Sequence, residues 1–447
     1  MIAFFKRQAI RSIASPYGLA MLSYCLFLFA WLFPPGLYTE YVREPDLMFL
    51  NPITLVFYSV CVAAFLLGVH FSRFFRSPAG RSNATHVSAR HPALYLVGPL
   101  FLAACFCSMY LILLGGKLNF VALLASQHGD AIKTANEMGK ESQGRWDESL
   151  PLLTAILWWS LFRARQLRVR GMNKKLFYLI FFPSMGVGIL TCIATVDRTS
   201  LMPIIIGCLV ISLFYKSRGA KVRLGSLVVT GLGSMTAVIG LFLIFSFLRG
   251  ALAIHVLMTS LLGYTIVSYN RLTGLLMGVM HYAYEGRGVY LSRYVLEDVK
   301  LNSVFHLIDR FGWPNGFTLW QSEFLSTSAS GLNSTFIWSG AFGYVYSDLG
   351  WWTPLFLCLV GVLAGYLWAR FNVGKTVGVV LYPWVGFWIL TWFATNSIFG
   401  VNFIRYIEFA VVLTFYDWVF LRKQYEAAGN MQIPDPRLTF LPDRRIF

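Results

Sequence analysis

Long runs of apolar residues recur along the chain and are separated by short polar segments. A helix needs roughly 20 apolar residues to cross the hydrocarbon core of a bilayer, and ten runs come near that length. They cover residues 17–34, 53–72, 94–114, 149–162, 176–196, 200–215, 224–248, 351–371, 377–396 and 404–421. The fourth and sixth runs are short, but flanking Arg and Lys side chains can reach the interface from within the membrane. The pattern predicts an all-α polytopic membrane protein with about ten transmembrane helices.

The composition narrows the class of protein further. Of the 447 residues, 57% are hydrophobic and only 13% are charged, and the mean hydropathy is +0.61. A soluble domain carries about a quarter charged residues, so a soluble enzyme, a disordered protein and a coiled coil are all excluded. The abundance of Phe (39), Tyr (22) and Trp (14) suits a chain that crosses two membrane–water interfaces many times.

The net charge of +17 does not indicate nucleic acid as a partner, because the positive charge is confined to loops on one side of the predicted spans. Most of the 37 Lys and Arg residues lie in segments 6–11, 73–90, 163–175, 216–223, 370–375 and the tail from 422. Positively charged loops stay in the cytoplasm. We therefore expect both termini to be cytoplasmic.

One segment breaks the pattern of short loops. Residues 249–350 lie on the outer side between the seventh and eighth spans, and they contain a further apolar run at 251–269. We expect an external subdomain of amphipathic or re-entrant helices; the alternative is a 12-span chain in which 251–269 and 331–348 both cross. The apolar stripe of Val304, Leu307, Ile308 and Phe311 has helical spacing and predicts one such helix. The chain then divides into a seven-span region (1–248), the large outer loop (249–350), a three-span region (351–421) and a basic cytoplasmic tail (422–447).

Motifs for soluble cofactors are missing from the sequence. The seven cysteines fall inside apolar runs, without the spacing of a disulfide framework or a zinc site. No Walker A motif, no GxGxxG after a strand and no HExxH motif occurs. We expect neither a metal nor a nucleotide cofactor.

Four arginines lie at ends of apolar runs or beside them, on the outer side: Arg198, Arg249, Arg271 and Arg405. Ionised groups at such a depth are costly, so a functional role is the first hypothesis. The guanidinium fork donates two parallel hydrogen bonds and suits a phosphate group. Each arginine also has a structural alternative, since it can anchor a helix end or pair with a nearby acid, as Arg405 can with Glu408 at i, i+3.

A transfer reaction also needs a group that takes a proton from an acceptor hydroxyl. The candidates all lie in the outer loop and are His281, Glu285, His306, Asp309 and Glu323. The sequence does not choose among them. Three further arginines of this loop are expected on a solvated face: Arg287, Arg293 and Arg310.

Several local segments and the predicted topology carry a resemblance to a known family. Residues 197–199 (Asp-Arg-Thr) stand at the outer end of a middle span, and Arg249 ends the seventh span. Residues 333–336 (Asn-Ser-Thr-Phe) precede residues 346–350 (Tyr-Ser-Asp-Leu-Gly) before the next span. With inner termini and one large outer loop in the second half, the chain resembles the Wzy-type oligosaccharide repeat-unit polymerases, relatives of the O-antigen ligases. It departs from the family pattern at Asp197, where a small polar residue is common.

The resemblance implies a metal-independent glycosyltransferase on the periplasmic face of the bacterial inner membrane, making a surface polysaccharide such as O-antigen or exopolysaccharide. The donor would be an oligosaccharide on undecaprenyl pyrophosphate, and the acceptor the terminal sugar of another lipid-linked unit. The four outer arginines would hold the pyrophosphate, and a flippase and a chain-length regulator are possible partners. The alternatives are an O-antigen ligase-like transferase and a transporter of polysaccharide or lipid-linked sugars.

Overall fold

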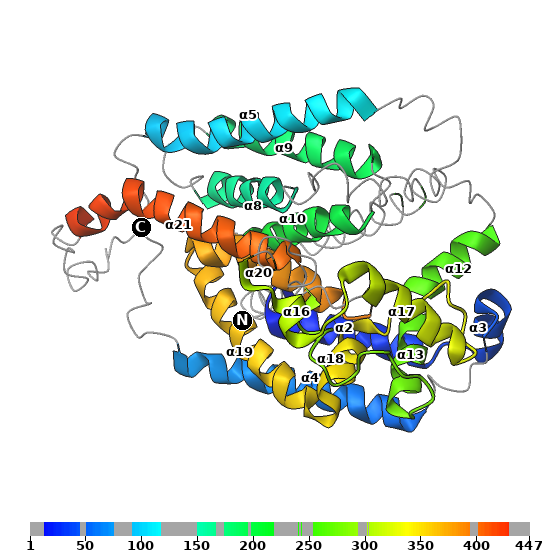
Figure 1. Cartoon of the computed structure of the whole chain (residues 1–447). Helices are drawn as coiled ribbons and strands as arrows, with labels where there is room; N and C mark the ends of the chain where they lie inside the picture. The colour runs from blue at the N-terminus through cyan, green and yellow to red at the C-terminus, as the bar shows by residue number, and fades with distance from the viewer. Residues whose placement is uncertain are drawn as a thin grey trace, which may run out of the picture.

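The regular structure of the chain is helical. The computed structural model describes residues 13–44, 51–75, 92–117, 150–166, 174–194, 198–218, 240, 243, 254–293, 302, 304–393 and 401–428. Within these ranges every regular element is a helix and no β-strand occurs, which confirms the all-α prediction there (Figure 1). A helix occupies nine of the ten predicted runs; the seventh run, 224–248, lies almost entirely outside the described residues.

Two groups of helices make up the described structure. The bundle consists of α2 (Pro16–Trp31), α3 (Pro35–Val42), α4 (Pro52–Phe71), η1 (Ser72–Phe75), α5 (Pro92–Lys117), α8 (Leu150–Gln166), α9 (Lys174–Ala194), α10 (Arg198–Arg218), α19 (Thr353–Asn372), α20 (Thr376–Leu390) and α21 (Val401–Ala428). The second group, which we call the helical subdomain, consists of α12 (Ile254–Tyr264), α13 (Ile266–Leu276), α16 (Leu307–Phe311), α17 (Gly316–Ala329) and α18 (Gly340–Leu349). The short η5 (Gly350–Trp352) joins α18 to α19.

Three helical segments are long and apolar enough to cross a membrane: Pro52–Phe75, Lys175–Ile193 and Gly340–Asn372. A fourth is added if α2 and α3, which meet at a bend of 87°, together form one span. Shorter apolar helices cover Val97–Met109, Leu201–Lys216 and Thr376–Leu390. These segments have the length and composition of membrane helices, while the expected number of ten spans stays a prediction.

The bundle is layered (Figure 1). Helices α5 and α9 pack together at one edge, α8, α10, α20 and α21 fill the middle, and α2, α4 and α19 form the opposite edge. Aromatic side chains such as Trp158, Trp159 and Trp388 are fully buried between the layers.

Local sequence signals set where the helices of the bundle begin. A proline occupies the first turn of α2 and of α4, where its missing N–H costs nothing. The preceding residues cap these helices, since the side chain of Ser15 accepts from the N–H of Gly18 and that of Asn51 from the N–H of Ile53.

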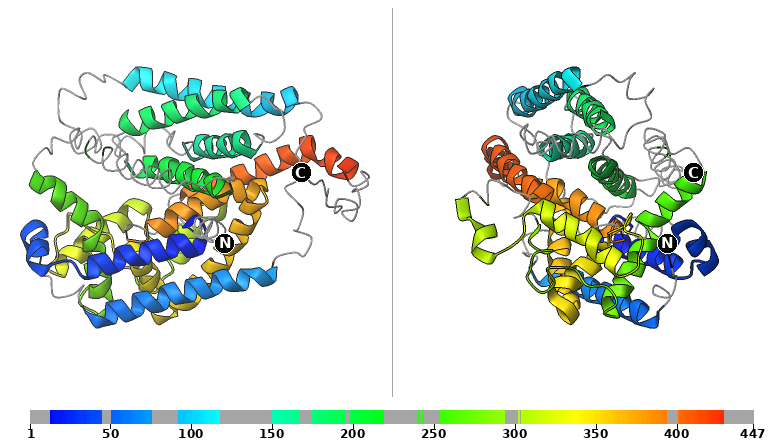
Figure 2. Two further views of the ribbon diagram at one scale, coloured as in Figure 1. Left: turned by 180° about the vertical axis from the view of Figure 1, so that it is seen from behind. Right: turned by 45° about the vertical axis from the view of Figure 1, so that its right-hand side comes forward.

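Glycines allow α4 and α19 to lie side by side and parallel (Figure 2). A Cβ atom added to Gly68 would lie 1.9 Å from the carbonyl oxygen of Cys358, and one added to Gly361 would lie 2.1 Å from the carbonyl oxygen of Phe65. Gly361 and Gly365 form a GxxxG pattern on α19, which lets two backbones approach closely within a membrane. No larger side chain fits at this contact without moving a helix.

A buried polar cluster ties four helices together at one end of the bundle. Arg163 of α8 donates to the Oδ2 atom of Asp417 on α21 at 2.8 Å and to the hydroxyl of Thr376 on α20 at 3.1 Å. Tyr95 of α5 donates to the Oδ1 atom of Asp417 at 2.7 Å. We call this end the basic end, because the described helix termini that meet there carry Arg163, Arg165, Lys174, Lys175, Arg370 and Lys375.

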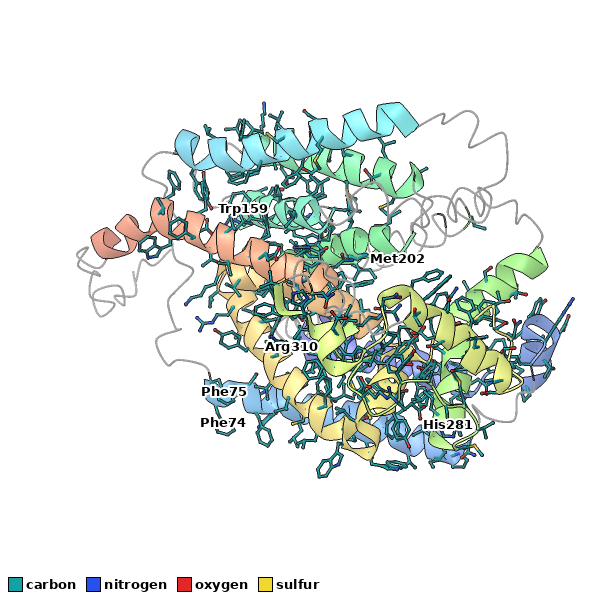
Figure 3. All side chains as sticks on the ribbon, in the orientation of Figure 1. Phe74, Phe75, Trp159, Met202, His281 and Arg310 are labelled. Atoms are coloured by element: carbon teal, nitrogen blue, oxygen red, sulfur yellow. The ribbon has the colours of Figure 1, made fainter. Side chains whose placement is uncertain are left out.

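The helical subdomain lies at the opposite end. Figure 3 shows His281 far from Phe74 and Phe75, which follow the end of α4 on the side of the basic end. The helices α12 and α13 meet at a break at Thr265 and have eleven residues each, so each is about 16 Å long and neither crosses a membrane by itself. Every residue of α13 is buried, and it packs against α18, α2 and α4.

The apolar stripe at helical spacing in the outer loop does lie on a helix. This helix, α16, has five residues, and none of them is buried. Val304, just before it, and Phe311 are 69% and 61% exposed.

The contact between α4 and α19 yields a test of the packing. Replacing Gly361 by Leu forces the two backbones apart, so we expect the thermal stability of the detergent-solubilised protein to fall by about 1 to 3 kcal/mol or more. The matched control is Gly186→Leu on α9, where an added Cβ meets nothing within 4 Å. Equal melting temperatures for the two variants would show that the α4–α19 contact is not close-packed.

Candidate functional site

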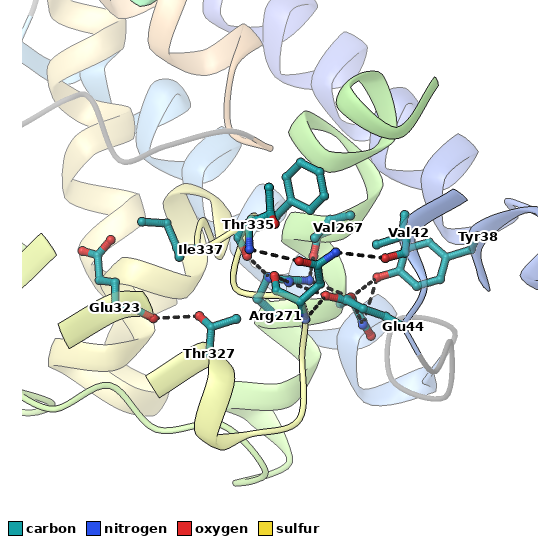
Figure 4. Close-up of polar contacts among 12 residues, drawn as sticks. Tyr38, Val42, Glu44, Val267, Arg271, Glu323, Thr327, Thr335 and Ile337 are labelled. Carbon is teal, nitrogen blue, oxygen red and sulfur yellow. Dashed lines mark hydrogen bonds and ion pairs between the residues drawn. The ribbon is translucent and has the colours of Figure 1, made fainter. Parts of the chain in front are cut away.

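Arg271 lies at the centre of a polar network that joins three distant segments of the chain (Figure 4). It projects from the fully buried α13, and its side chain is itself completely buried. Its guanidinium forms a two-pronged ion pair with Glu44, just after α3, with N–O distances of 2.5 and 2.8 Å. The third segment is the loop before α18, which supplies the carbonyl oxygens of Asn333 and Phe336.

All five N–H groups of Arg271 have acceptors within the protein. Nε donates to Phe336 at 2.6 Å, the two terminal nitrogens donate to Glu44, and their remaining N–H groups reach Asn333 at 2.8 Å and Val267 at 3.4 Å. A buried guanidinium is tolerated only when it is paired and hydrogen-bonded in this way. In this arrangement no donor is left for a pyrophosphate, so Arg271 positions the surrounding segments.

Glu44 is equally enclosed. Besides Arg271, it accepts from the hydroxyl of Tyr38 at 2.6 Å, the side-chain amide of Asn270 at 3.3 Å and the backbone N–H of Asn333 at 2.6 Å. Burial on its own would raise the pKa of Glu44, but the hydrogen bonds and the charge of Arg271 outweigh it and hold this pKa below its ordinary value. The carboxylate is therefore ionised at neutral pH.

A second polar cluster lies within the helical subdomain. Glu323 of α17 is fully buried and accepts from Arg293 at 3.0 Å and from the hydroxyl of Tyr344 at 3.2 Å. The side chain of Arg293 is 28% exposed, so it connects the buried carboxylate with the surface. The rings of Tyr282, Tyr290 and Tyr344 pack against one another, with centroids 5.1 to 5.8 Å apart, and Tyr344 connects them to Glu323. Arg293 thus belongs to an ion pair, which corrects the expectation of a solvated face.

The end of α18 holds the turn that leads to Arg293. The Oδ2 atom of Asp348 accepts from the N–H of Leu291 at 2.7 Å, and the carbonyl of Ser347 accepts from the N–H of Gly286 at 2.9 Å. Gly286 has a φ of 71° and Gly288 one of 72°, a conformation that favours glycine. Residues 346–350, one of the segments behind the family resemblance, therefore fix the backbone that presents Arg293.

His281 and Glu285 meet at the surface of the same turn. Nδ1 of His281 lies 3.1 Å from a carboxylate oxygen of Glu285, and Nε2 lies 3.0 Å from the carbonyl oxygen of Gly278. A carbonyl oxygen only accepts, so Nε2 carries a proton, and the carboxylate favours a second proton on Nδ1. The hydrogen bond to Glu285 accordingly raises the pKa of His281. The geometry favours a doubly protonated ring, and a general base needs a free ring nitrogen instead.

The remaining candidates are dispersed. His306 is exposed at the start of α16 and lies 4.0 Å from Asp309, which is also exposed. Arg405 is buried and donates to both carboxylate oxygens of Glu408 at 3.1 Å, as its spacing indicated. Arg198 opens α10, but its side chain and the whole of Arg249 lie outside the described residues. The structure therefore joins Glu323 with Arg293 and His281 with Glu285, and it places Arg271 and Arg405 in separate ion pairs.

Sequence reasoning missed Glu44 and Asn270, and it expected Arg293 on a solvated face and not in an ion pair. Glu44 stands 227 positions before Arg271, in a polar stretch with other acids, so no spacing connects the two. One signal was available, because an arginine inside a segment as apolar as α13 requires a buried acid somewhere in the chain.

Removing the countercharge of Arg271 tests whether this ion pair stabilises the fold. Glu44→Gln leaves the guanidinium buried without a countercharge, so we expect it to destabilise the folded protein by about 3 to 5 kcal/mol. The control Glu285→Gln breaks an exposed pair and should cost less than about 1 kcal/mol. Thermal unfolding in detergent measures both, and a Glu44→Gln variant as stable as the control would contradict the assigned role.

A second prediction follows from the raised pKa of His281. A group whose pKa is raised by folding stabilises the protein fully below its unfolded-state value of 6.5, and this stabilisation is lost as the pH rises through the higher folded-state value. Because the pair is exposed, the effect should stay below about 1 kcal/mol. We expect the melting temperature of wild type to exceed that of His281→Ala at pH 6 by more than at pH 9. A difference that grows with pH would refute this geometry.

Comparison with protein-family models, with curated proteins and with solved structures found no match.

Proposed function

We propose that this protein is a membrane glycosyltransferase that polymerises oligosaccharide repeat units carried on undecaprenyl pyrophosphate. It would work on the periplasmic face of the bacterial inner membrane, with both termini in the cytoplasm and ten spans. The basic end of the bundle supports this orientation, since Arg163, Lys175 and Arg370 lie at helix termini there and positive charge favours the cytoplasmic side. The helical subdomain then faces the periplasm.

The observation that carries the proposal is the pair of Arg293 and Glu323 in that subdomain. A partly exposed guanidinium is held by a buried carboxylate, on a turn fixed by Asp348. Such a group is preorganised to donate hydrogen bonds to an anionic substrate as charge develops on it. Arg293 therefore joins Arg198 and Arg249 as a proposed ligand of the lipid pyrophosphate, while Arg271 acts as a positioning residue.

The reaction needs no nucleotide because the donor sugar is already activated. A hydroxyl oxygen of the acceptor sugar forms a bond to the anomeric carbon of the donor glycan. The bond from that carbon to the pyrophosphate oxygen breaks, and undecaprenyl pyrophosphate leaves with the electron pair. The hydroxyl proton passes to a base of the helical subdomain, for which Glu285 and His306 are the proposed candidates, since Glu323 is buried and holds Arg293. Arginines at the outer boundary stabilise the charge of the leaving group.

The closest alternative is a ligase that transfers a finished glycan to another acceptor. The two functions differ in what a deletion strain accumulates. Loss of a polymerase leaves single repeat units on the lipid carrier, whereas loss of a ligase leaves long polymer that is not attached to its final acceptor.

The proposal is tested by deleting the gene and restoring it with variants. Arg198→Ala, Arg249→Ala and Arg293→Ala should each lower polymer formation about 100-fold or more, because each removes a donor to the developing charge. Gel analysis of extracted glycan, with membrane levels of each variant measured by immunoblot, gives the readout.

The matched control is Arg310→Ala, which removes an exposed arginine of α16 in the same subdomain. It should restore full polymer. If all three test variants also restore full polymer, or if the deletion strain accumulates no lipid-linked single units, the proposed function is wrong.

A further inference from the structure

The segment from α16 to α17 carries an exposed apolar surface. It consists of Val304, Phe305, Phe311, Phe317, Trp320 and Leu325, and we call it the α16–α17 surface. The exposed fractions of these side chains run from 38% for Trp320 to 72% for Leu325. So many large apolar side chains on adjoining segments mark a surface that contacts something other than water.

Helix α17 has the reverse of the pattern expected for a helix in water. Its one ionisable residue, Glu323, is fully buried, while Phe317, Trp320 and Leu325 point outward. The other exposed side chains of α17 are uncharged, Thr318 and Gln321 among them. A water-facing helix places charges outside and apolar residues inside, so the outer face of α17 suits an apolar surrounding better than water.

Aromatic rings dominate this surface and lie against one another. The rings of Phe311 and Trp313 have centroids 4.8 Å apart, and Trp320 lies 4.7 Å from Phe324 and 6.1 Å from Phe317. Helices that lie in the interface of a bilayer carry Trp, Phe and Leu on the face that enters the acyl-chain boundary. The Phe, Trp and Leu side chains of this surface match that composition.

The charged residues of α16 indicate how deep in a membrane the α16–α17 surface can lie. His306, Asp309 and Arg310 are all exposed beside the apolar residues. Ionised groups of that kind are costly in the hydrocarbon core but are solvated among lipid head groups.

We propose that the α16–α17 surface is seated in the head-group region of a phospholipid bilayer, with its apolar side chains among the acyl chains. The same apolar phase already covers the exposed side chains of the bundle, such as Val411 and Leu359, which are 62% and 63% exposed. Glu323 lies on the opposite face of α17 and holds Arg293, so this seating fixes the Arg293–Glu323 pair at the lipid boundary. Only the assignment to the periplasmic leaflet rests on the proposed function.

Photo-crosslinking in membranes tests this seating. The photoreactive residue p-benzoylphenylalanine is introduced into the full-length protein at Trp320 or at Leu325, and the membranes are irradiated. Mass spectrometry of the purified protein then identifies the adduct. We expect phospholipid adducts at both positions, at a yield comparable to that of the positive control at Val411 on α21.

The negative control is the same residue at His281, whose side chain is 67% exposed and which Figure 3 shows apart from Arg310 of α16. It should give no phospholipid adduct. Adducts with another protein or with a second copy of the chain at Trp320 and Leu325, or no adduct above the His281 level, would overturn the proposal.

Failure here is distinguishable from failure of the proposed function. Polymer formation by the same variants is measured in parallel in the deletion strain. Polymer without lipid adducts rejects the seating and leaves the function standing. Lipid adducts in a strain whose deletion never accumulates lipid-linked single units reject the function and support the seating.

Discussion

The saturated ion pair between Arg271 and Glu44 is the interaction on which the arrangement of the helical subdomain depends. A guanidinium without any exposed surface is stable only if every N–H meets an acceptor, and here the acceptors come from α13, from Glu44 just after α3 and from the loop before α18. The cost of leaving one donor unpaired makes this geometry specific. The pair therefore connects the N-terminal helices to a subdomain more than 200 residues later in the chain.

The bundle supplies a rigid frame for that subdomain. Close glycine contacts hold α4 against α19, and the cluster around Asp417 joins four helices at the basic end. In an apolar surrounding, polar side chains are stabilised best by one another, so polar clusters and close backbone contacts hold helices together where the hydrophobic effect does little. A turn held by Asp348 then presents Arg293, paired with the buried Glu323, in the helical subdomain.

The sequence predicted the positions of the helices better than the contacts between their side chains. Hydropathy alone located nine helices, because twenty apolar residues in a row have few alternatives to a buried or membrane-embedded helix. It could not pair Arg271 with Glu44, since attraction between charges distant in sequence leaves no trace in local spacing. The stripe that includes Leu307 and Phe311 predicted a helix but not its surroundings, because periodicity reveals an apolar face and not what covers it. Arg293 was assigned to solvent for a similar reason, since its buried acid lies 30 positions away.

If the proposed function is right, the protein alone joins lipid-linked glycans at an outer site and needs no nucleotide. Reconstitution tests this, with the purified protein in liposomes that contain only undecaprenyl-pyrophosphate-linked repeat units, a chelator and no nucleotide sugar. We expect a ladder of lipid-linked oligomers together with the release of free undecaprenyl pyrophosphate. Single repeat units that persist unchanged, in liposomes whose protein is shown to be folded, would contradict it.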